Sequence, residues 1–164
     1  MVDQEINELI QLLELEAHPE GGYYRETYRA DLRMEAQELG MEGLRNVCTA
    51  IYFLLTSENF SAFHRIRSDE LWHFYKGDPL HIHEIDEEGQ YTVHKLSGEL
   101  DKGQPQCVIR AGSWFASEVA SGGAYALVGC TVSPGFDFTD FEMADRSLIK
   151  HYPEHQDLLS RLIR

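Results

Sequence analysis

The sequence predicts one all-β domain, a barrel or a two-sheet sandwich, with a short helix before it and a helical tail after it. Three observations indicate this fold class. The chain has 164 residues, the usual size of one domain, and 43% of them are apolar, which is enough for a continuous core. Its middle consists of short runs rich in β-branched and aromatic residues, and clusters of turn-forming residues separate them. Eight or nine strands at this spacing are typical of a barrel or sandwich.

The first element is a short amphipathic helix. Between residues 6 and 15, apolar side chains recur near the helical period with acidic residues between them. We expect the helix to stop near His18 and Pro19, because proline restricts the residue before it. Gly21 and Gly22 then allow a turn, and a strand is predicted over Tyr23–Arg29.

Two segments outside the strand-rich middle complete the domain. Residues 31–46 are polar and charged, and we expect an excursion there, either a helical turn or a loop of a length that is often functional. The tail has apolar groups on both sides of Tyr152 and Pro153, which predicts two short helical pieces with a break. We therefore expect a single domain over 1–164, with the N-terminal helix in 1–17, the barrel in 18–140 and the tail in 141–164.

The composition excludes some classes of partner. The chain has 28 acidic residues and 14 Lys and Arg, so its formal charge of −14 repels nucleic acid. It lacks a run of eighteen apolar residues and a basic N-terminal segment, so we expect no membrane partner and a cytoplasmic location. Cys48, Cys107 and Cys130 are odd in number and widely spaced, which favours reduced, structural thiols over disulfides or a zinc site.

The candidate site lies in the segment SAFHRIRSDELWHFYKG, residues 61–77. It places His64 and Glu70 on adjoining strands across a charged turn. If side chains alternate, His64 shares a face with Ile66, and Glu70 shares a face with Trp72 and Phe74. A histidine and a carboxylate among apolar and aromatic side chains are typical of a pocket wall, because burial shifts their pKa values and the apolar lining orients small ligands.

This segment resembles the first motif of the cupin superfamily: Gly, five residues, His-x-His, three or four residues, Glu, six residues, Gly. His64, Glu70 and Gly77 match the motif, and Ile66 stands at its second His. The resemblance covers roughly residues 49–132 and extends to most of the chain. The chain looks like the uncharacterised single-domain cupins related to the deoxysugar epimerases. The resemblance implies a double-stranded β-helix, the jelly-roll barrel.

The second cupin motif, Pro-x-Gly, two residues, His, is similar to residues 110–115, which keep Gly112 and carry Phe115 in place of the His. Trp114 and Phe115 follow this glycine, where cupins usually contact ligand. The resemblance therefore implies that both residues bind ligand, and ordinary barrel core is the alternative. We assign Trp72 and Phe74 to the same ligand-binding wall.

The altered motifs bear on metal binding. Metal-dependent cupins hold iron, manganese, zinc or nickel with three His and one Glu, whereas Ile66 and Phe115 donate no ligand. We therefore expect no cofactor. A divalent transition metal would need His64, Glu70 and a further ligand, for which His73 is nearest, but its odd spacing from Glu70 turns it to the opposite face.

A second pair of histidines, His81 and His83, shares a strand face beside several carboxylates, an arrangement that can bind a divalent ion. The charged surroundings favour a solvated edge strand with alternating His and Ile. A glycine- and proline-containing segment over residues 129–138 favours a turn from the last strand into the tail over a pocket rim.

The segment HPEGGYYRETYR, residues 18–29, resembles a stretch near the start of the deoxysugar epimerases that helps to hold the nucleotide-sugar across a dimer. Gly22, Tyr24, Glu26 and Thr27 match that order. The resemblance implies that Tyr24 and Glu26 bind ligand and that the chain forms a homodimer by exchanging N-terminal strands. A strand that pairs with the barrel or with a neighbour's sheet explains the segment equally well.

In those epimerases a His on the inner strand is the base and a Tyr on a later strand is the acid. His64 fits the base, but Tyr125 stands only at the start of its strand, so the acid is absent or moved. We predict a small-molecule-binding cupin that acts on a carbohydrate-like or small polar ligand with His64 and Glu70 as catalytic residues, as a metal-independent isomerase- or epimerase-like enzyme. The alternatives are a metal-dependent oxygenase or lyase that uses the same two residues, and a non-enzymatic interaction protein.

Overall fold

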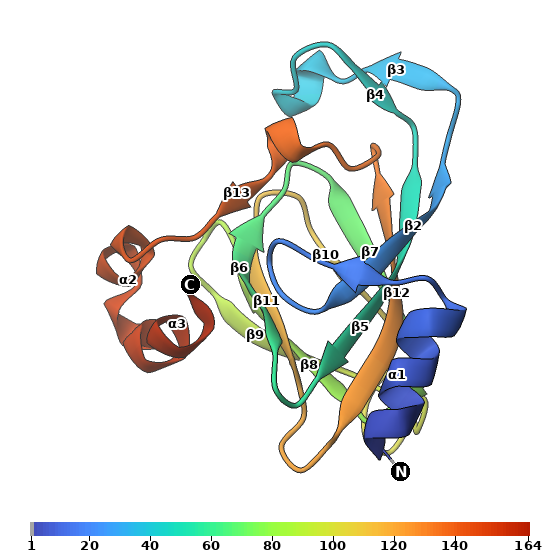
Figure 1. Ribbon diagram of the computed structural model, residues 1–164. Helices are drawn as coiled ribbons and strands as arrows, with labels where there is room; N and C mark the ends of the chain where they lie inside the picture. Colours follow the sequence, from blue (N-terminus) through green and yellow to red (C-terminus); the bar gives the residue numbers. More distant parts are fainter. Residues whose placement is uncertain (1) are drawn as a thin grey trace.

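Two antiparallel β-sheets face each other and enclose the core in the computed structural model, which describes residues 2–164 (Figure 1). The larger sheet has the order β1-β2-β5-β12-β7-β10 and the smaller one β13-β6-β11-β8-β9. The strands of the larger sheet are β1 (Glu16–Ala17), β2 (Tyr23–Arg29), β5 (Thr49–Thr56), β12 (Tyr125–Ser133), β7 (Asp69–Gly77) and β10 (Gln106–Ile109). Those of the smaller sheet are β13 (Glu142–Met143), β6 (Phe60–Arg65), β11 (Trp114–Val119), β8 (Leu80–Ile85) and β9 (Tyr91–Leu96). The predicted all-β jelly-roll barrel is confirmed.

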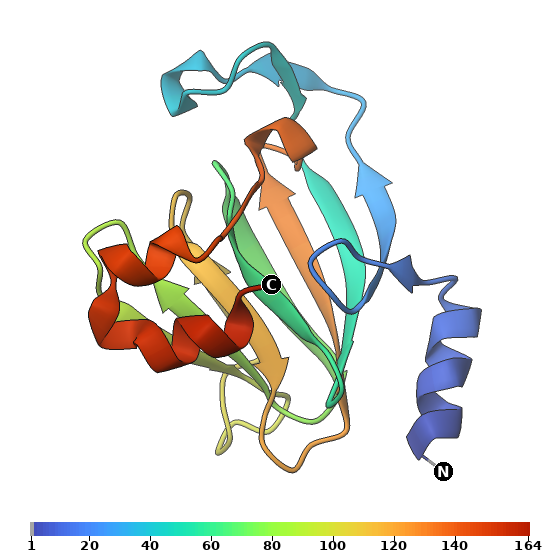
Figure 2. The same ribbon diagram turned by 60° about the vertical axis from the view of Figure 1, so that its left-hand side comes forward.

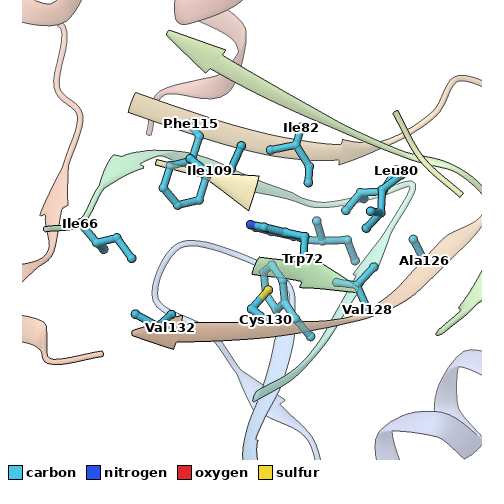
Figure 3. Packing of buried hydrophobic residues seen from close by; sticks show 13 residues of the cluster. Ile66, Trp72, Leu80, Ile82, Ile109, Phe115, Ala126, Val128, Cys130 and Val132 are labelled. Atoms are coloured by element: carbon cyan, nitrogen blue, oxygen red, sulfur yellow. The ribbon is translucent and has the colours of Figure 1, made fainter. Parts of the chain in front are cut away.

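The core lies between the two sheets and follows from the alternation of side chains along each strand. On β5, Phe53 and Leu55 point into the barrel and Leu54 points to the outer face. Trp72 and Phe115 are each 1% exposed and pack near the centre, with their rings 6.3 Å apart. Figure 3 shows the inward-pointing side chains of this cluster. Burial of each large apolar side chain contributes about 1.5–3 kcal/mol, so this layer is the main source of stability.

Helices cover the outer faces of both sheets (Figure 2). Helix α1 (Val2–Leu12) places Ile6, Leu9 and Ile10 against the outer face of the larger sheet, where Leu54 and Tyr125 are buried. The tail forms α2 (Ser147–His151), the 3-10 turn η3 (Pro153–His155) and α3 (Gln156–Leu162), which cover the outer face of the smaller sheet. The two helical pieces with a break predicted for the tail are therefore confirmed.

Residues 31–46 form an arm beyond the end of the barrel (Figure 1). The arm consists of β3 (Arg33–Glu35), the 3-10 turn η1 (Gln37–Leu39) and β4 (Leu44–Asn46), and β3 pairs only with β4. A buried ion pair fixes its base: Arg45 Nε lies 2.6 Å from Asp140 Oδ2, and both side chains are 8% exposed. Asp140 belongs to the 3-10 turn η2 (Phe138–Asp140), which follows β12.

Two sequence-based expectations need correction. Helix α1 ends at Leu12 and not near His18, because Glu14 adopts a positive φ of 53° and turns the chain so that Leu15 is buried. The strand with alternating His and Ile, β8, is not an exposed edge strand. It lies between β11 and β9, and His83 is only 6% exposed because the tail covers this face. No helix within residues 2–164 is long and apolar enough to span a membrane.

Candidate functional site

A cavity of about 370 Å³ opens at one end of the barrel. In Figure 3, Ile66 and Val132 lie at the end of the core cluster opposite Leu80 and Ala126, and both also line this cavity. The lining combines buried ionisable side chains with more exposed acidic and aromatic ones. The lining residues are Glu16, His18, Glu20, Tyr24, Glu26, Arg29, Thr49, Ile51, His64, Ile66, Glu70, Cys130, Val132, Phe136, Asp137 and Phe138.

The floor of the cavity contains an ion pair between two segments that are far apart in the sequence. Strand β6 carries His64, and the loop between β1 and β2 carries Glu20. Glu20 Oε2 lies 2.9 Å from His64 Nδ1, and Nδ1 also lies 2.7 Å from the carbonyl oxygen of Ala62. Glu20 is 6% and His64 3% exposed, so little water screens this pair. Phe115, at a ring distance of 4.1 Å, and Phe141, at 5.3 Å, hold the imidazole in place.

Each partner changes the pKa of the other. Burial acts to lower the pKa of His64, but the charge of Glu20 outweighs burial and raises that pKa above the ordinary 6.5. Burial likewise acts to raise the pKa of Glu20, and the attraction of His64 lowers it below the ordinary 4.5. Both directions favour the charged forms, an imidazolium paired with a carboxylate.

Glu70 on β7 faces the same cavity but has no cation of its own. Burial is the main cause that raises its pKa to about 7, and the negative charge of Glu20 adds to it, while His64 opposes the rise. The thiol of Cys130 shares a hydrogen bond with this carboxyl group, and burial holds the pKa of Cys130 well above 9.0. Glu70 is therefore a carboxyl group that gains and loses its proton near neutral pH.

His18 completes the floor as a neutral ring. Its Nδ1 accepts a hydrogen bond from the backbone N–H of Glu20 at 3.2 Å and lies 3.4 Å from Glu20 Oε1. Burial lowers its pKa below 6.5. Its ring packs edge-on against Tyr24 at 4.5 Å. His18 therefore positions the loop that carries Glu20 and does not add a second cation.

The more exposed part of the lining forms the mouth of the cavity. Within residues 2–164, its only guanidinium is that of Arg29, on β2, and Glu26 binds it through both carboxylate oxygens at 2.9 and 2.7 Å. Asp137 accepts hydrogen bonds from Thr139, which lower its pKa. Aromatic side chains border these charges, namely Tyr24, Phe136 and Phe138. The mouth is acidic and aromatic.

A family model described as the cupin superfamily (DUF985) matches residues 7–144 of the chain. The chain belongs to this family. The fold is also similar to that of oxalate decarboxylase of Bacillus subtilis. The match has a TM-score of 0.54 at 15% sequence identity and covers 89% of this cupin and 36% of the oxalate decarboxylase chain. That likeness concerns the fold alone.

Other relatives of this DUF985 cupin are similar over nearly the whole chain. Protein SO0799 of Shewanella oneidensis is 38% identical, covers 96% of both chains and has a TM-score of 0.87. A hypothetical protein of Leishmania major is 34% identical, covers 96% of this chain and 97% of its own, and has a TM-score of 0.88. The uncharacterized protein YML079W of Saccharomyces cerevisiae is 29% identical over 82% of this chain and 73% of its own. None of these descriptions names a substrate or an activity.

The structure places the predicted site residues of this cupin in two groups. His64, Glu70, Tyr24 and Glu26 line the cavity together. The four predicted aromatic contacts are not among the residues of 2–164 that line it. Trp72, Phe74 and Phe115 belong to the core between the sheets, and Trp114 lies under the tail on the outer face, where Arg65 stacks on its ring at 4.6 Å.

Two further expectations concern residues beside the site. The segment 129–138 does turn the chain after β12, but Phe136, Asp137 and Phe138 also form part of the rim, which we had not favoured. His73 points away from the cavity as its spacing predicted, and its ring nitrogens bond Thr131 and Gln106.

Sequence reasoning missed His18 and Glu20. They stand on either side of Pro19 and directly before two glycines, which is a local signal for a tightly turned loop that carries polar groups. The local sequence does not indicate where this loop packs, because the carboxylate of Glu20 approaches His64 only in the tertiary structure.

The donor set does not fit the metal site of metal-dependent cupins. Within residues 2–164, no group of three or more His, Cys, Asp or Glu is arranged to hold a metal ion. Nδ1 of His64 lies within hydrogen-bonding distance of the Ala62 carbonyl oxygen and of Glu20. Ile66, which lines the cavity at the position of the second motif His, has no atom that could coordinate a metal.

Proposed function

We propose that this cupin binds a small, carbohydrate-like polar molecule in the cavity and moves a proton on it without a metal, as an isomerase- or epimerase-like enzyme. The observation that carries the proposal is Glu70, a cavity-facing carboxyl group with a pKa of about 7 beside a paired imidazolium. A proton-transfer group works best when its pKa lies near the operating pH.

The charges suggest a role for each group. Glu20 raises the pKa of His64 and so favours its protonated form, which makes the ionised form of Glu70 the better base. We infer that Glu70 removes a proton from a carbon next to a carbonyl group. The electron pair moves to the carbonyl oxygen, and the imidazolium of His64 donates a hydrogen bond to that oxygen through Nε2. This assignment reverses the role of base that the epimerase resemblance implied for His64.

The size of the cavity supports a small ligand. Its volume of about 370 Å³ is near the lower end of the range of about 300–1,000 Å³ that is typical of ligand pockets. A monosaccharide-sized molecule suits this volume better than a nucleotide-sugar. Glu70 can also return the proton to the former carbonyl carbon on the same face. The hydroxyl proton of the adjacent carbon then passes to the former carbonyl oxygen by way of His64 Nε2, and the carbonyl group has moved to that adjacent carbon.

Deuterium exchange tests the proposal. The protein is incubated with a panel of aldoses, ketoses and 2-keto acids in D₂O, and proton NMR follows the loss of signal at the carbon next to the carbonyl group. We expect exchange with at least one compound and a fall of about 10²–10⁴-fold in Glu70→Gln, the range for loss of a general base. Glu58→Gln, in the exposed turn between β5 and β6, is the matched control and should exchange at the wild-type rate.

Three outcomes would contradict the proposal. The first is exchange that persists in Glu70→Gln, and the second is the absence of exchange with every compound, which would favour a binding or interaction protein. The third is activity that requires a stoichiometric transition metal, measured by elemental analysis, which would favour the metal-dependent alternative.

A further inference from the structure

The lining of the cavity is unbalanced in charge. It contains five carboxyl groups, those of Glu16, Glu20, Glu26, Glu70 and Asp137, and one guanidinium, that of Arg29. The His64 imidazolium is matched by Glu20, and His18 is held neutral because burial lowers its pKa. Carboxylates therefore outnumber the cations available to a ligand.

The one guanidinium is fully used by the protein. Nε and Nη2 of Arg29 donate to the two carboxylate oxygens of Glu26, Nη1 donates to Asn46 Oδ1 at 3.0 Å, and both Nη atoms donate to the carbonyl oxygen of Phe136 at 3.2 Å. These five hydrogen bonds match the five N–H groups of a guanidinium. Arg29 therefore has no donor left for a phosphate or carboxylate group of a ligand.

Acceptors, in contrast, are left free. Glu20 Oε2 is buried and accepts no hydrogen bond within residues 2–164, although it lies 2.9 Å from His64 Nδ1, because that nitrogen is directed to the Ala62 carbonyl oxygen at 2.7 Å. A buried carboxylate oxygen without a donor is costly, which points to a donor supplied by a ligand. At the mouth, both hydrogen bonds of Asp137 go to Oδ1, so Oδ2 can accept from a ligand.

The surroundings of these acceptors also favour a cation. Tyr24, Phe136 and Phe138 border the mouth, and Phe138 is 54% exposed. Aromatic faces attract ammonium groups. The net charge of −14 raises the local concentration of cations and lowers that of anions around the whole protein.

We propose that the ligand of this cavity carries a protonated amine, as an amino sugar or amino polyol does, and that Glu16 and Asp137 receive the ammonium group at the mouth. The free acceptors, the saturated guanidinium and the aromatic border carry this inference. It rests on the ligand-binding role of the cavity and excludes phosphorylated and carboxylated compounds as ligands. Their anionic groups would meet carboxylates, because the cationic side chains of the lining within residues 2–164, Arg29 and His64, are already paired with Glu26 and Glu20.

Four linear six-carbon probes that differ mainly in charge test the proposal: glucamine, sorbitol, sorbitol 6-phosphate and gluconate. Their affinities are measured by titration calorimetry at low ionic strength, with melting temperature as a second readout. Glucamine should bind at least about tenfold more tightly than sorbitol, since a charge-assisted hydrogen bond contributes about that much. The two anionic probes should bind more weakly than sorbitol.

Variants locate the ammonium group. Asp137→Asn and Glu16→Gln should each reduce the affinity for glucamine several-fold and leave that for sorbitol unchanged. Both residues lie at the mouth, so the fold should persist, and melting temperatures check this. Glu58→Gln, in the exposed turn between β5 and β6, should bind glucamine as the wild type does.

Equal or tighter binding of an anionic probe would overturn the proposal, as would glucamine binding no better than sorbitol at millimolar concentration. Deuterium exchange keeps the two proposals apart. If neutral sugars exchange deuterium but glucamine binds no better than sorbitol, the proposal of an amine ligand is wrong and that of proton transfer stands. If glucamine binds tightly but no compound exchanges deuterium, the proposal of proton transfer is wrong and that of an amine ligand stands.

Discussion

At the scale of single residues, the site depends on how three buried ionisable groups share charge. Glu20 and His64 lie 2.9 Å apart and neutralise each other, so the environment of Glu70 contains almost no net positive charge. A carboxyl group in such a place keeps its proton to a higher pH than usual, because its ionised form is neither solvated nor paired. Burial therefore raises the pKa of Glu70 to about 7, and the ion pair between Glu20 and His64 does not cancel this rise because the two charges act on Glu70 in opposite directions.

The raised pKa of Glu70 predicts a pH-dependent stability. Between about pH 4.5 and 7 the folded protein retains a proton that the unfolded chain releases, so this group destabilises the fold as the pH rises. Glu70→Gln lacks the ionised form. Its free energy of unfolding should therefore rise relative to wild type by up to about 3 kcal/mol between pH 4 and pH 8.

Urea denaturation of both proteins at several pH values measures this difference. Glu58→Gln should differ from wild type by the same small amount at each pH. A difference between Glu70→Gln and wild type that does not change with pH would show that Glu70 ionises in the ordinary range.

The residues of the site differ in how well the sequence predicts them. His64 and Glu70 lie on adjoining strands at a spacing that a regular hairpin converts into a shared cavity, so the motif was sufficient. Trp72 shares the inward face with Glu70 but lies deeper in the barrel, where the opposing sheet covers it. Alternation predicts the face of a strand and not the depth along it, which explains why Trp72 and Phe74 were assigned to the site.

At the scale of elements, the loop over residues 18–22 decides whether the site exists. It connects β1 to β2 and lies against β6. The backbone N–H of Ala62, on β6, donates a hydrogen bond to the carbonyl oxygen of Glu20 at 2.9 Å. Gly21 and Gly22 have φ values of 109° and 79°. Both glycines lie in the left-handed region that side chains disfavour, so the loop depends on them.

Gly22→Ala should disrupt this loop. A Cβ atom at Gly22 would lie 2.7 Å from the carbonyl oxygen of Leu54, in addition to the strain of a φ of 79°. Gly122→Ala is the matched control, because its φ is 85° but a Cβ atom there meets nothing within 4 Å. We expect a loss of about 1–2 kcal/mol in the control, the cost of the left-handed conformation.

The loss in Gly22→Ala should exceed that of the control, since backbone of β5 must move to admit the new atom. Urea denaturation of both variants measures the two losses, and glucamine binding reports on the loop itself. Equal losses of unfolding free energy would mean that the loop moves to admit the Cβ atom, so that its close contact with β5 contributes nothing to stability.

The strands themselves show what the sequence could and could not predict of the fold. Short β-rich runs predicted the nine longer strands β2 and β5–β12, because each run is bounded by turn residues, but they did not predict the short strands β1, β3, β4 and β13 or the order within the sheets. The burial of β8 was not predictable from its own residues, since His83 is covered by the tail and bonds Tyr91 at 2.8 Å and Glu118 at 3.0 Å. A polar outer face becomes a buried one only when a distant element packs on it.

At the scale of the whole molecule, the arm and the neighbouring end of β2 expose several large apolar side chains. The edge of β2 lacks a partner strand beyond Tyr24 within residues 2–164, because β1 pairs only with Tyr23 and Tyr24. An unpaired edge next to apolar side chains is typical of a surface that pairs with another chain. The arm and the end of β2 carry these side chains: Tyr28, Leu32, Met34, Leu39 and Leu44, which are between 43% and 70% exposed.

We therefore expect a homodimer in which the β2 edge and the arm of each subunit pack against the other subunit. Light scattering after gel filtration at micromolar concentration should give twice the chain mass of 18.8 kDa. Leu32→Asp should yield a folded monomer, because Leu32 is 70% exposed within one chain and a buried charge at the interface is unfavourable. Leu100→Asp, at 73% exposure in a different hairpin, should remain dimeric. A monomeric wild type would contradict the expectation, and a dimer that both variants preserve would move the interface to another face.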